Sequence, residues 1–197
     1  MPTWPGGTRS GANGARCNRV SVANPFILTA ALPPDLAGYA EGLRRAHFPP
    51  ERNHLHAHVT LFHAFAPSLL EELRAFLPKL AREFAAPQGA VKGVMDLGKG
   101  TAIALEAPEL LHLRALIADH FHGSLTSQDL HEPRPHITIQ NKVTKGEARA
   151  LQASLAPALG PWIAKGRFAF PALELHLYRG GPWEPVKTFA FRGRVRL

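Results

Sequence analysis

The sequence predicts an α+β fold with two lobes, because its elements run in the same order twice along the chain. In each half, a helical segment is followed by a β-branched strand, a second helix and two further strands. Each of the two matching strands opens with a histidine that is followed two residues later by a threonine. Short turns join strands into antiparallel pairs, so we expect two antiparallel sheets with helices packed outside them.

The first half of the chain contains the first set of these elements. Pro33-Pro34 ends an apolar strand, and Asp35 is placed to cap the helix that follows. A later strand is rich in β-branched and aromatic residues, and the next helix has a continuous apolar stripe. In order, the predicted elements are a strand over residues 24–32, a helix over 35–47, a strand over 58–65, a helix from Pro67, and a hairpin formed by residues 91–97 and 101–106.

The second half repeats this order. Pro108 starts an apolar helix, and Pro135 precedes a second β-branched strand. Thr144 and Glu147 have the spacing of a capping box, in which each side chain bonds the backbone N–H of the other residue. In order, the predicted elements are a helix from Pro108, a strand over residues 136–143, a helix over 144–155, and a hairpin formed by residues 168–178 and 186–197.

The two matching strands begin with the same motif. The first reads His58-Val59-Thr60-Leu61 and the second reads His136-Ile137-Thr138-Ile139. Side chains alternate between the faces of a strand, so the histidine and threonine of each motif lie on one face. The apolar residues of the motif point to the opposite face and can fill a core. Each strand is therefore expected to present an imidazole and a hydroxyl side by side.

These paired motifs resemble the H-x-T-x motifs of the 2H phosphoesterase superfamily, which includes 2′-5′ RNA ligases and 2′,3′-cyclic nucleotide phosphodiesterases. The segments 58–65, 134–143 and 178–183 also resemble bacterial 2′-5′ RNA ligase-like proteins. The resemblance covers residues 22–197. It implies one bilobal domain with pseudo-twofold symmetry, in which each lobe contributes one motif to a central cleft.

The residue types of the motifs suit the opening of a cyclic phosphodiester. That reaction needs a base for the nucleophile and an acid for the leaving oxygen, and histidine titrates nearest neutrality. His58 and His136 are the candidate base and acid, in an order that the symmetry leaves open. Thr60 and Thr138 are candidate donors to the non-bridging phosphate oxygens. The resemblance implies action on 2′,3′-cyclic phosphate ends or 2′-5′ linkages of RNA or nucleotides, with reversible 2′-5′ RNA ligation as a further activity.

Five further residues are candidate substrate contacts. Arg134 lies just before the second motif and can hold phosphate charge. Gln140 and Phe62 continue the inward faces of the two strands. Tyr178 and Trp183 flank the glycine turn of the last hairpin, where an aromatic ring can stack on a base. For each of the five, the competing interpretation is ordinary packing or an exposed surface position.

His54, His56 and His58 form a run of alternating histidines, which offers an alternative as a zinc site. An extended strand would place all three on one face. The run follows Pro49-Pro50, however, and begins in a predicted loop with only Glu51 as a nearby acidic ligand. We therefore expect no metal and no other cofactor.

Composition limits the remaining possibilities. The 197 residues carry a formal net charge of +8, and the excess lies in residues 1–22 and 160–197, which suits an anionic substrate such as an RNA end. No apolar run is long enough to span a bilayer, so we expect a cytoplasmic protein without a membrane partner. Residues 1–21 are expected to form a disordered leader, and the single cysteine, Cys17, excludes an intrachain disulfide. The internal repeat already supplies a twofold axis, so we expect a monomer.

Two alternatives to the phosphoesterase remain open from the sequence. A non-catalytic RNA-binding module would use the same cleft and the basic C-terminal segment without turnover. A zinc hydrolase would be built on the run of histidines. The intact threonines of both motifs favour the phosphoesterase, because a binding module does not need two poised acid–base groups.

Overall fold

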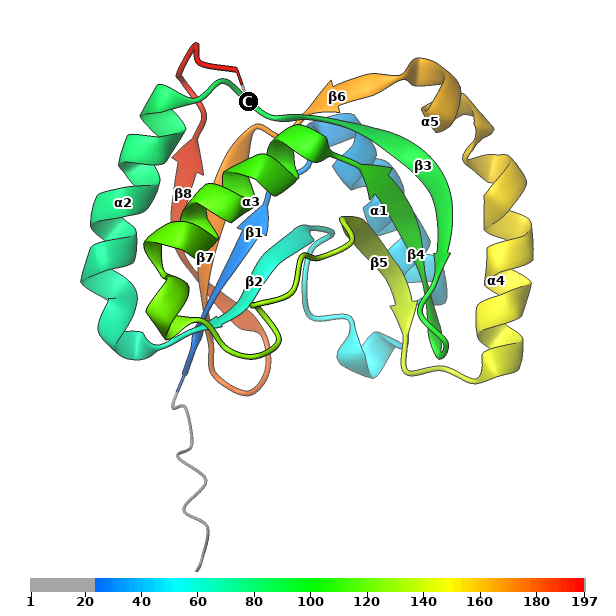
Figure 1. Ribbon diagram of the computed structural model, residues 1–197. Helices are drawn as coiled ribbons and strands as arrows, with labels where there is room; N and C mark the ends of the chain where they lie inside the picture. Colours follow the sequence, from blue (N-terminus) through cyan, green and yellow to red (C-terminus); the bar gives the residue numbers. More distant parts are fainter. Residues whose placement is uncertain (1–23, 197) are drawn as a thin grey trace, which may run out of the picture.

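A computed structural model describes residues 24–196, which form two four-stranded antiparallel sheets with helices outside them (Figure 1). The predicted α+β class is therefore confirmed. The predicted leader at residues 1–21, including Cys17, lies outside the described residues. No helix within residues 24–196 combines the length and the apolar character needed to cross a bilayer.

The first sheet combines strands from both ends of the described chain. Its central strands are β1 and β7, which pair antiparallel with each other. The edge strand β2 contains the first motif from Val59 onward, and β8 forms the opposite edge. The bounds are β1 (Phe26–Ala30), β2 (Val59–Phe65), β7 (Ala172–Tyr178) and β8 (Trp183–Ala190).

The second sheet is arranged in the same way around its own motif. Its edge strand β5 begins at His136, and β4 and β3 follow inward as the predicted hairpin. The short strand β6 closes the far edge. The bounds are β3 (Gln88–Asp96), β4 (Gly100–Glu106), β5 (His136–Asn141) and β6 (Arg167–Ala169).

The predicted continuous strand over residues 168–178 is wrong. The chain leaves the second sheet after β6 and enters the first sheet at β7, and Phe170-Pro171 lies between the two strands. Phe170 is fully buried there, and its N–H donates to the carbonyl of Pro87 rather than to a strand partner. The last hairpin therefore completes the sheet of the first motif, so the lobes are not the two halves of the sequence.

The helices tie the two sheets together. α2 packs against β7 and β8, and α4 packs against β3 and β4, but α1 crosses from the first sheet to pack against β5. The C-terminal end of α3 returns to the first sheet, where Phe121 packs edge-on against Phe65 of β2 at 5.2 Å between ring centroids. The bounds are α1 (Pro34–His47), α2 (Leu70–Glu83), α3 (Pro108–His120), α4 (Lys145–Ala158) and α5 (Gly160–Lys165).

The two predicted helix caps have different outcomes. The capping box at α4 is confirmed, because Thr144 accepts from the N–H of Glu147 and the Glu147 carboxylate accepts from the N–H of Thr144. The cap at α1 is wrong, because Pro33 occupies that position and Asp35 lies inside the first turn. Pro34 occupies the first helical position, where an N–H would have no partner within the helix, and it holds the preceding Pro33 in an extended conformation.

Candidate functional site

The structure brings the two motif strands together. β2 and β5 are edge strands of different sheets, and they lie side by side near the middle of the molecule (Figure 1). His58 and Thr60 are partly exposed, whereas Val59 and Leu61 are buried. The second motif has the same pattern of exposed and buried residues. Each strand therefore offers an imidazole and a hydroxyl on its accessible side, as the alternation within the motifs predicts.

Both motif histidines are held by the same backbone contact. The Nδ1 atom of His58 lies 2.6 Å from the carbonyl oxygen of His56, and that of His136 lies 2.7 Å from the carbonyl oxygen of Arg134. A carbonyl only accepts hydrogen bonds, so in each pair Nδ1 donates. The proton that each ring gains or loses is then the one on Nε2, which leaves Nε2 available as base or as acid.

A bulge at the last residue of each motif reverses the faces that the sequence predicts beyond it. In the first sheet, Thr60 pairs with Thr29, but Phe62 pairs with Leu28, so one residue of β2 has no counterpart. Phe62 is consequently turned into the core, where it is fully buried. The prediction that Phe62 contacts substrate is therefore wrong, because a bulge shifts the alternation by one residue.

The second sheet contains the equivalent bulge. Thr138 pairs with Ala102, whereas Gln140 pairs with Thr101. Thr101 faces α4, since its hydroxyl donates to the carbonyl of Ala148. Gln140 is therefore turned toward the helix side and is only 6% exposed. The expectation that Gln140 continues the face of the second motif is wrong for the same reason as at Phe62.

A buried arginine on α1, which the sequence analysis missed, binds the strand of the second motif. Arg44 is 3% exposed, and its Nη1 donates to the carbonyl of Thr138 at 2.7 Å. Its Nη2 donates to the carbonyl of Leu55 and to Oδ1 of Asn53, both in the loop that leads to the first motif. One guanidinium therefore connects the two motif segments.

Arg114 on α3 makes the reciprocal connection. Its Nε donates to the carbonyl of Leu61, inside the bulge of the first motif, at 3.4 Å. Its Nη2 donates to the carbonyls of Asp129 and His131, in the loop that leads to the second motif. Both arginines could be found in the sequence by their position. Each lies among the apolar residues of its helix rather than on the polar face.

The surroundings of His58 favour its neutral form. Its ring packs against the indole of Trp183, with 4.8 Å between ring centroids. This burial, with smaller effects from the nearby Arg44 and His176, lowers the pKa of His58 from 6.5 to about 4. His58 is therefore uncharged at neutral pH and can accept a proton.

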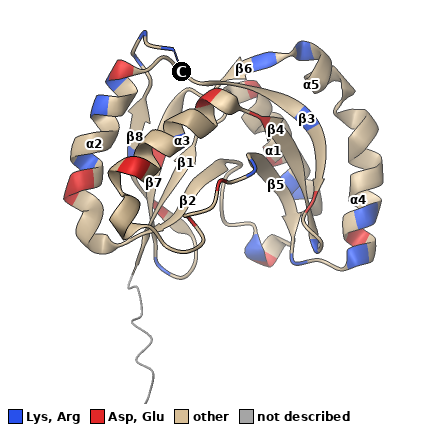
Figure 2. Cartoon of the chain, in the orientation of Figure 1, with Lys and Arg blue, Asp and Glu red and all other residues tan. Residues whose placement is uncertain are grey.

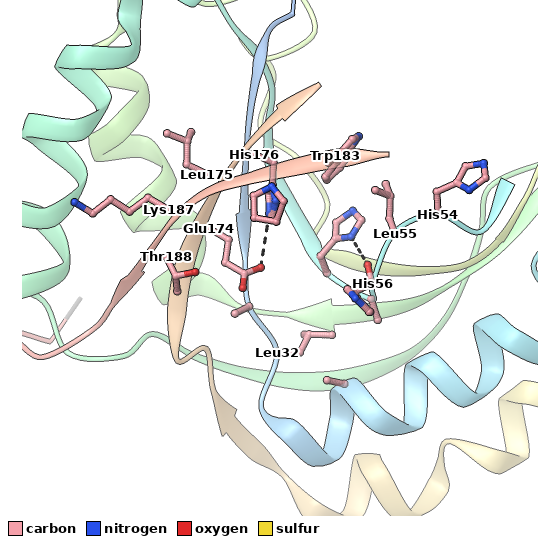
Figure 3. A pocket seen from close by; sticks show the side chains of 15 residues that line it. Leu32, His54, Leu55, His56, Glu174, Leu175, His176, Trp183, Lys187 and Thr188 are labelled. Carbon is pink, nitrogen blue, oxygen red and sulfur yellow. Dashed lines mark hydrogen bonds and ion pairs between the residues drawn. The ribbon is translucent and has the colours of Figure 1, made fainter. Parts of the chain in front are cut away.

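A cavity of about 340 Å³ opens beside His58, between the loop that precedes β2 and the strands β7 and β8 (Figure 3). Trp183, Glu174 and His176 line it together with His54 and His56. The cavity extends from His58 over the first sheet, and the residues of the second motif are not among those that line it. Trp183 is thus a cavity residue, and its stacking on a base stays a prediction.

The remaining candidates have more peripheral positions. Arg134 is exposed, and it contacts His136 through its backbone carbonyl oxygen. Tyr178 is 38% exposed and pairs with Trp183 across the last hairpin without lining the cavity. His54 and His56 line the cavity, but residues 24–196 contain no group of three or more metal-binding side chains placed to hold an ion.

Within residues 24–196, the basic residues are spread over several elements of the fold. Figure 2 shows Lys and Arg distributed over α2, α4, β6 and the connecting loops, with Asp and Glu between them. Within the basic C-terminal segment, Lys165 pairs with Asp35, and Nε of Arg179 lies 2.6 Å from Glu184. The net charge alone therefore does not mark a nucleic-acid surface.

Comparison with known proteins decides the family. A model of the 2′-5′ RNA ligase superfamily matches residues 32–182, a segment that contains both motifs. The chain belongs to the 2′-5′ RNA ligase superfamily. This confirms the resemblance to the 2H phosphoesterases, and membership supports an enzyme with a phosphoesterase-type activity.

Solved structures with the same fold resemble this superfamily member over most of its length. The protein TT0787 of Thermus thermophilus is 17% identical, with a TM-score of 0.59 over 87% of this chain and 100% of that chain. E. coli LigT in complex with NADP+ is 16% identical, with a TM-score of 0.54 over 86% of this chain and 98% of that chain. At these identities the likeness concerns the fold. No curated protein sequence matches the chain.

Proposed function

We propose that this superfamily member is a metal-independent phosphodiesterase that opens 2′,3′-cyclic phosphates at the ends of RNA or in nucleotides. The observation that carries the proposal is the matched pair of imidazoles on neighbouring strands, each with Nδ1 fixed on a carbonyl and Nε2 free. A nucleotide substrate is in line with the solved structures of E. coli LigT, which hold NADP+ and ATP. Cleavage of 2′-5′ linkages and its reversal, ligation, use the same groups.

His58 and His136 have different parts in the proposed reaction. Neutral His58 takes a proton from water through Nε2 while the water oxygen forms a bond to phosphorus. The bond between phosphorus and the ribose O3′ breaks, and His136 gives its Nε2 proton to O3′. The products are a 2′-phosphate and a 3′-hydroxyl, and proton exchange with solvent restores both rings. The hydroxyls of Thr60 and Thr138 donate to the non-bridging oxygens, where negative charge increases.

The pH dependence of kcat/KM tests the assignment of His58 as base. Because burial lowers its pKa to about 4, His58 stays neutral well below the usual range of a histidine. We expect the acidic limb of the kcat/KM profile for 2′,3′-cyclic AMP near pH 4 rather than near pH 6.5. An acidic limb at pH 6.5 or above would contradict the assignment.

The variant Trp183→Ala provides a matched test of the physical cause. Removing the indole exposes the His58 ring to water, so its pKa rises toward 6.5 and the acidic limb moves upward with it. The same shift affects stability, because between about pH 4 and 6.5 the unfolded chain binds a proton at His58 that the folded chain does not. The free energy of unfolding therefore falls as the pH drops through this range, and it falls less in the variant.

Product analysis tests the proposed function directly. The protein is incubated with each of the four 2′,3′-cyclic nucleotides, with and without excess EDTA, and the phosphate isomer is identified by chromatography. We expect hydrolysis that EDTA does not change and a 2′-phosphate product. Loss of activity with EDTA would favour the zinc hydrolase. Binding of RNA without turnover of any cyclic nucleotide would favour the non-catalytic module.

A further inference from the structure

The cavity beside His58 lies next to the first motif, and a row of paired residues connects the two. Across the first sheet, Thr60 pairs with Thr29, and Thr29 pairs with Glu174, so the three residues form a row on one face. Glu174 is two strands away from the motif threonine, which corresponds to about 10 Å at the usual strand spacing. A single nucleotide spans such a distance from its phosphate to the far edge of its base.

Glu174 supplies a carboxylate to this cavity (Figure 3). His176 lies beside it, with its Nε2 atom 3.7 Å from the carboxylate and 3.1 Å from the hydroxyl oxygen of Thr29. The interaction with His176 lowers the pKa of Glu174, so the group is ionised at neutral pH. A contact of 3.7 Å is longer than a hydrogen bond, so the carboxylate oxygens retain capacity for further donors.

The rest of the cavity is suited to a flat ring. Trp183 lines it with a large aromatic surface, and Ala31, Leu32 and Leu55 add apolar side chains. Its volume of about 340 Å³ falls in the range of small-molecule sites. Stacking on an indole stabilises any base, so this surface by itself does not select among bases.

The charge in the cavity decides which part of a nucleotide fits there. An ionised carboxylate repels phosphate, and Lys187, which is the one lysine in a lining without arginine, extends away from Glu174 and His176 in Figure 3. Its ammonium lies 5.7 Å from the centre of the Phe189 ring. The cavity therefore favours the neutral base over the phosphate, and the carboxylate favours an edge that carries N–H donors.

We propose, on the basis of the proposed function, that Glu174 makes this cavity selective for guanine. The Watson–Crick edge of guanine carries the N1–H and N2–H donors side by side, and a carboxylate accepts both. Adenine and cytosine place their amino group beside an acceptor nitrogen, and uracil has one N–H between two carbonyls. The preferred substrate is therefore a guanosine 2′,3′-cyclic phosphate, free or at the end of an RNA.

The base preference of Glu174→Gln tests this inference. Steady-state kcat/KM is measured for the four 2′,3′-cyclic nucleotides in the full chain and in the variant. We expect the unaltered chain to prefer the guanine substrate by about tenfold or more, which is the discrimination of one bidentate contact, and the variant to lose that preference. A purely structural role of Glu174 would lower kcat/KM for all four substrates by the same factor and would overturn the inference.

Glu184→Gln is the matched control. Glu184 lies in the same hairpin and loses the same charge, but it pairs with Arg179 outside the cavity. This variant should retain both the activity and the base preference of the unaltered chain. A guanine preference that survives in Glu174→Gln, or equal kcat/KM for all four bases in the unaltered chain, would also reject the role of Glu174.

Calorimetric titration with GMP, AMP, CMP and UMP separates this inference from the proposed function. If no cyclic nucleotide is hydrolysed but GMP binds at least about tenfold more tightly than the others, and Glu174→Gln removes the difference, the inference stands and the phosphodiesterase fails. If all four are hydrolysed and GMP has no advantage, the phosphodiesterase stands and the inference fails. If the chain neither binds nor hydrolyses any of them, both fail.

Discussion

Replacement of either motif histidine by alanine should lower kcat for a 2′,3′-cyclic nucleotide by about 10² to 10⁴-fold, the range that a positioned acid or base contributes. His58→Ala removes the group that accepts the proton from water, and His136→Ala removes the group that protonates the leaving oxygen. The two losses should not add in the double variant, because each residue acts in the same step. Single-turnover rates of the purified variants provide the measurement.

A histidine outside the site supplies the control for this experiment. His122 is exposed, and its Nδ1 lies 3.0 Å from the carbonyl of Asp119, so it has the same kind of backbone contact as the motif histidines. His122→Ala should retain the activity of the unaltered chain. If His58→Ala and His136→Ala both hydrolyse the substrate within about tenfold of the unaltered chain, the acid–base assignment is wrong.

Arg44→Met should cause the largest loss of stability among the substitutions considered. The change leaves the carbonyls of Thr138 and Leu55 and the side-chain oxygen of Asn53 without their donor. A buried polar group that loses its partner costs about 1–3 kcal/mol. We expect the free energy of unfolding in urea to fall by about 3 kcal/mol or more, and Arg114→Met to behave similarly.

The neighbouring Arg45 is the matched control for Arg44. It is exposed on the same helix, so Arg45→Met should change the free energy of unfolding by at most about 0.5 kcal/mol. Arg44→Lys keeps the charge but cannot reach three acceptors from one ammonium, and it should recover only part of the loss. If Arg44→Met costs less than about 1 kcal/mol, the guanidinium does not hold the motif segments together.

Local rules explain why the motif itself could be predicted. The alternation of side chains over His58-Val59-Thr60-Leu61 depends only on an extended backbone, and the structure retains it. The faces of Phe62 and Gln140 could not be predicted, because a bulge depends on how a strand pairs with its neighbour. Each bulge lies next to a carbonyl that a buried arginine binds, so its position is linked to contacts far along the chain.

The same distinction applies to the site as a whole. The sequence contains the signals for helices α1 to α4 and most strands, for the capping box at Thr144 and Glu147, and for the two motifs, because these signals span a few neighbouring residues. The tertiary structure decided that β7 and β8 complete the first sheet, which places Trp183 against His58 and Glu174 in the same cavity. Strand pairing across more than a hundred residues depends on which buried surfaces match after folding. No short segment of sequence specifies that pairing.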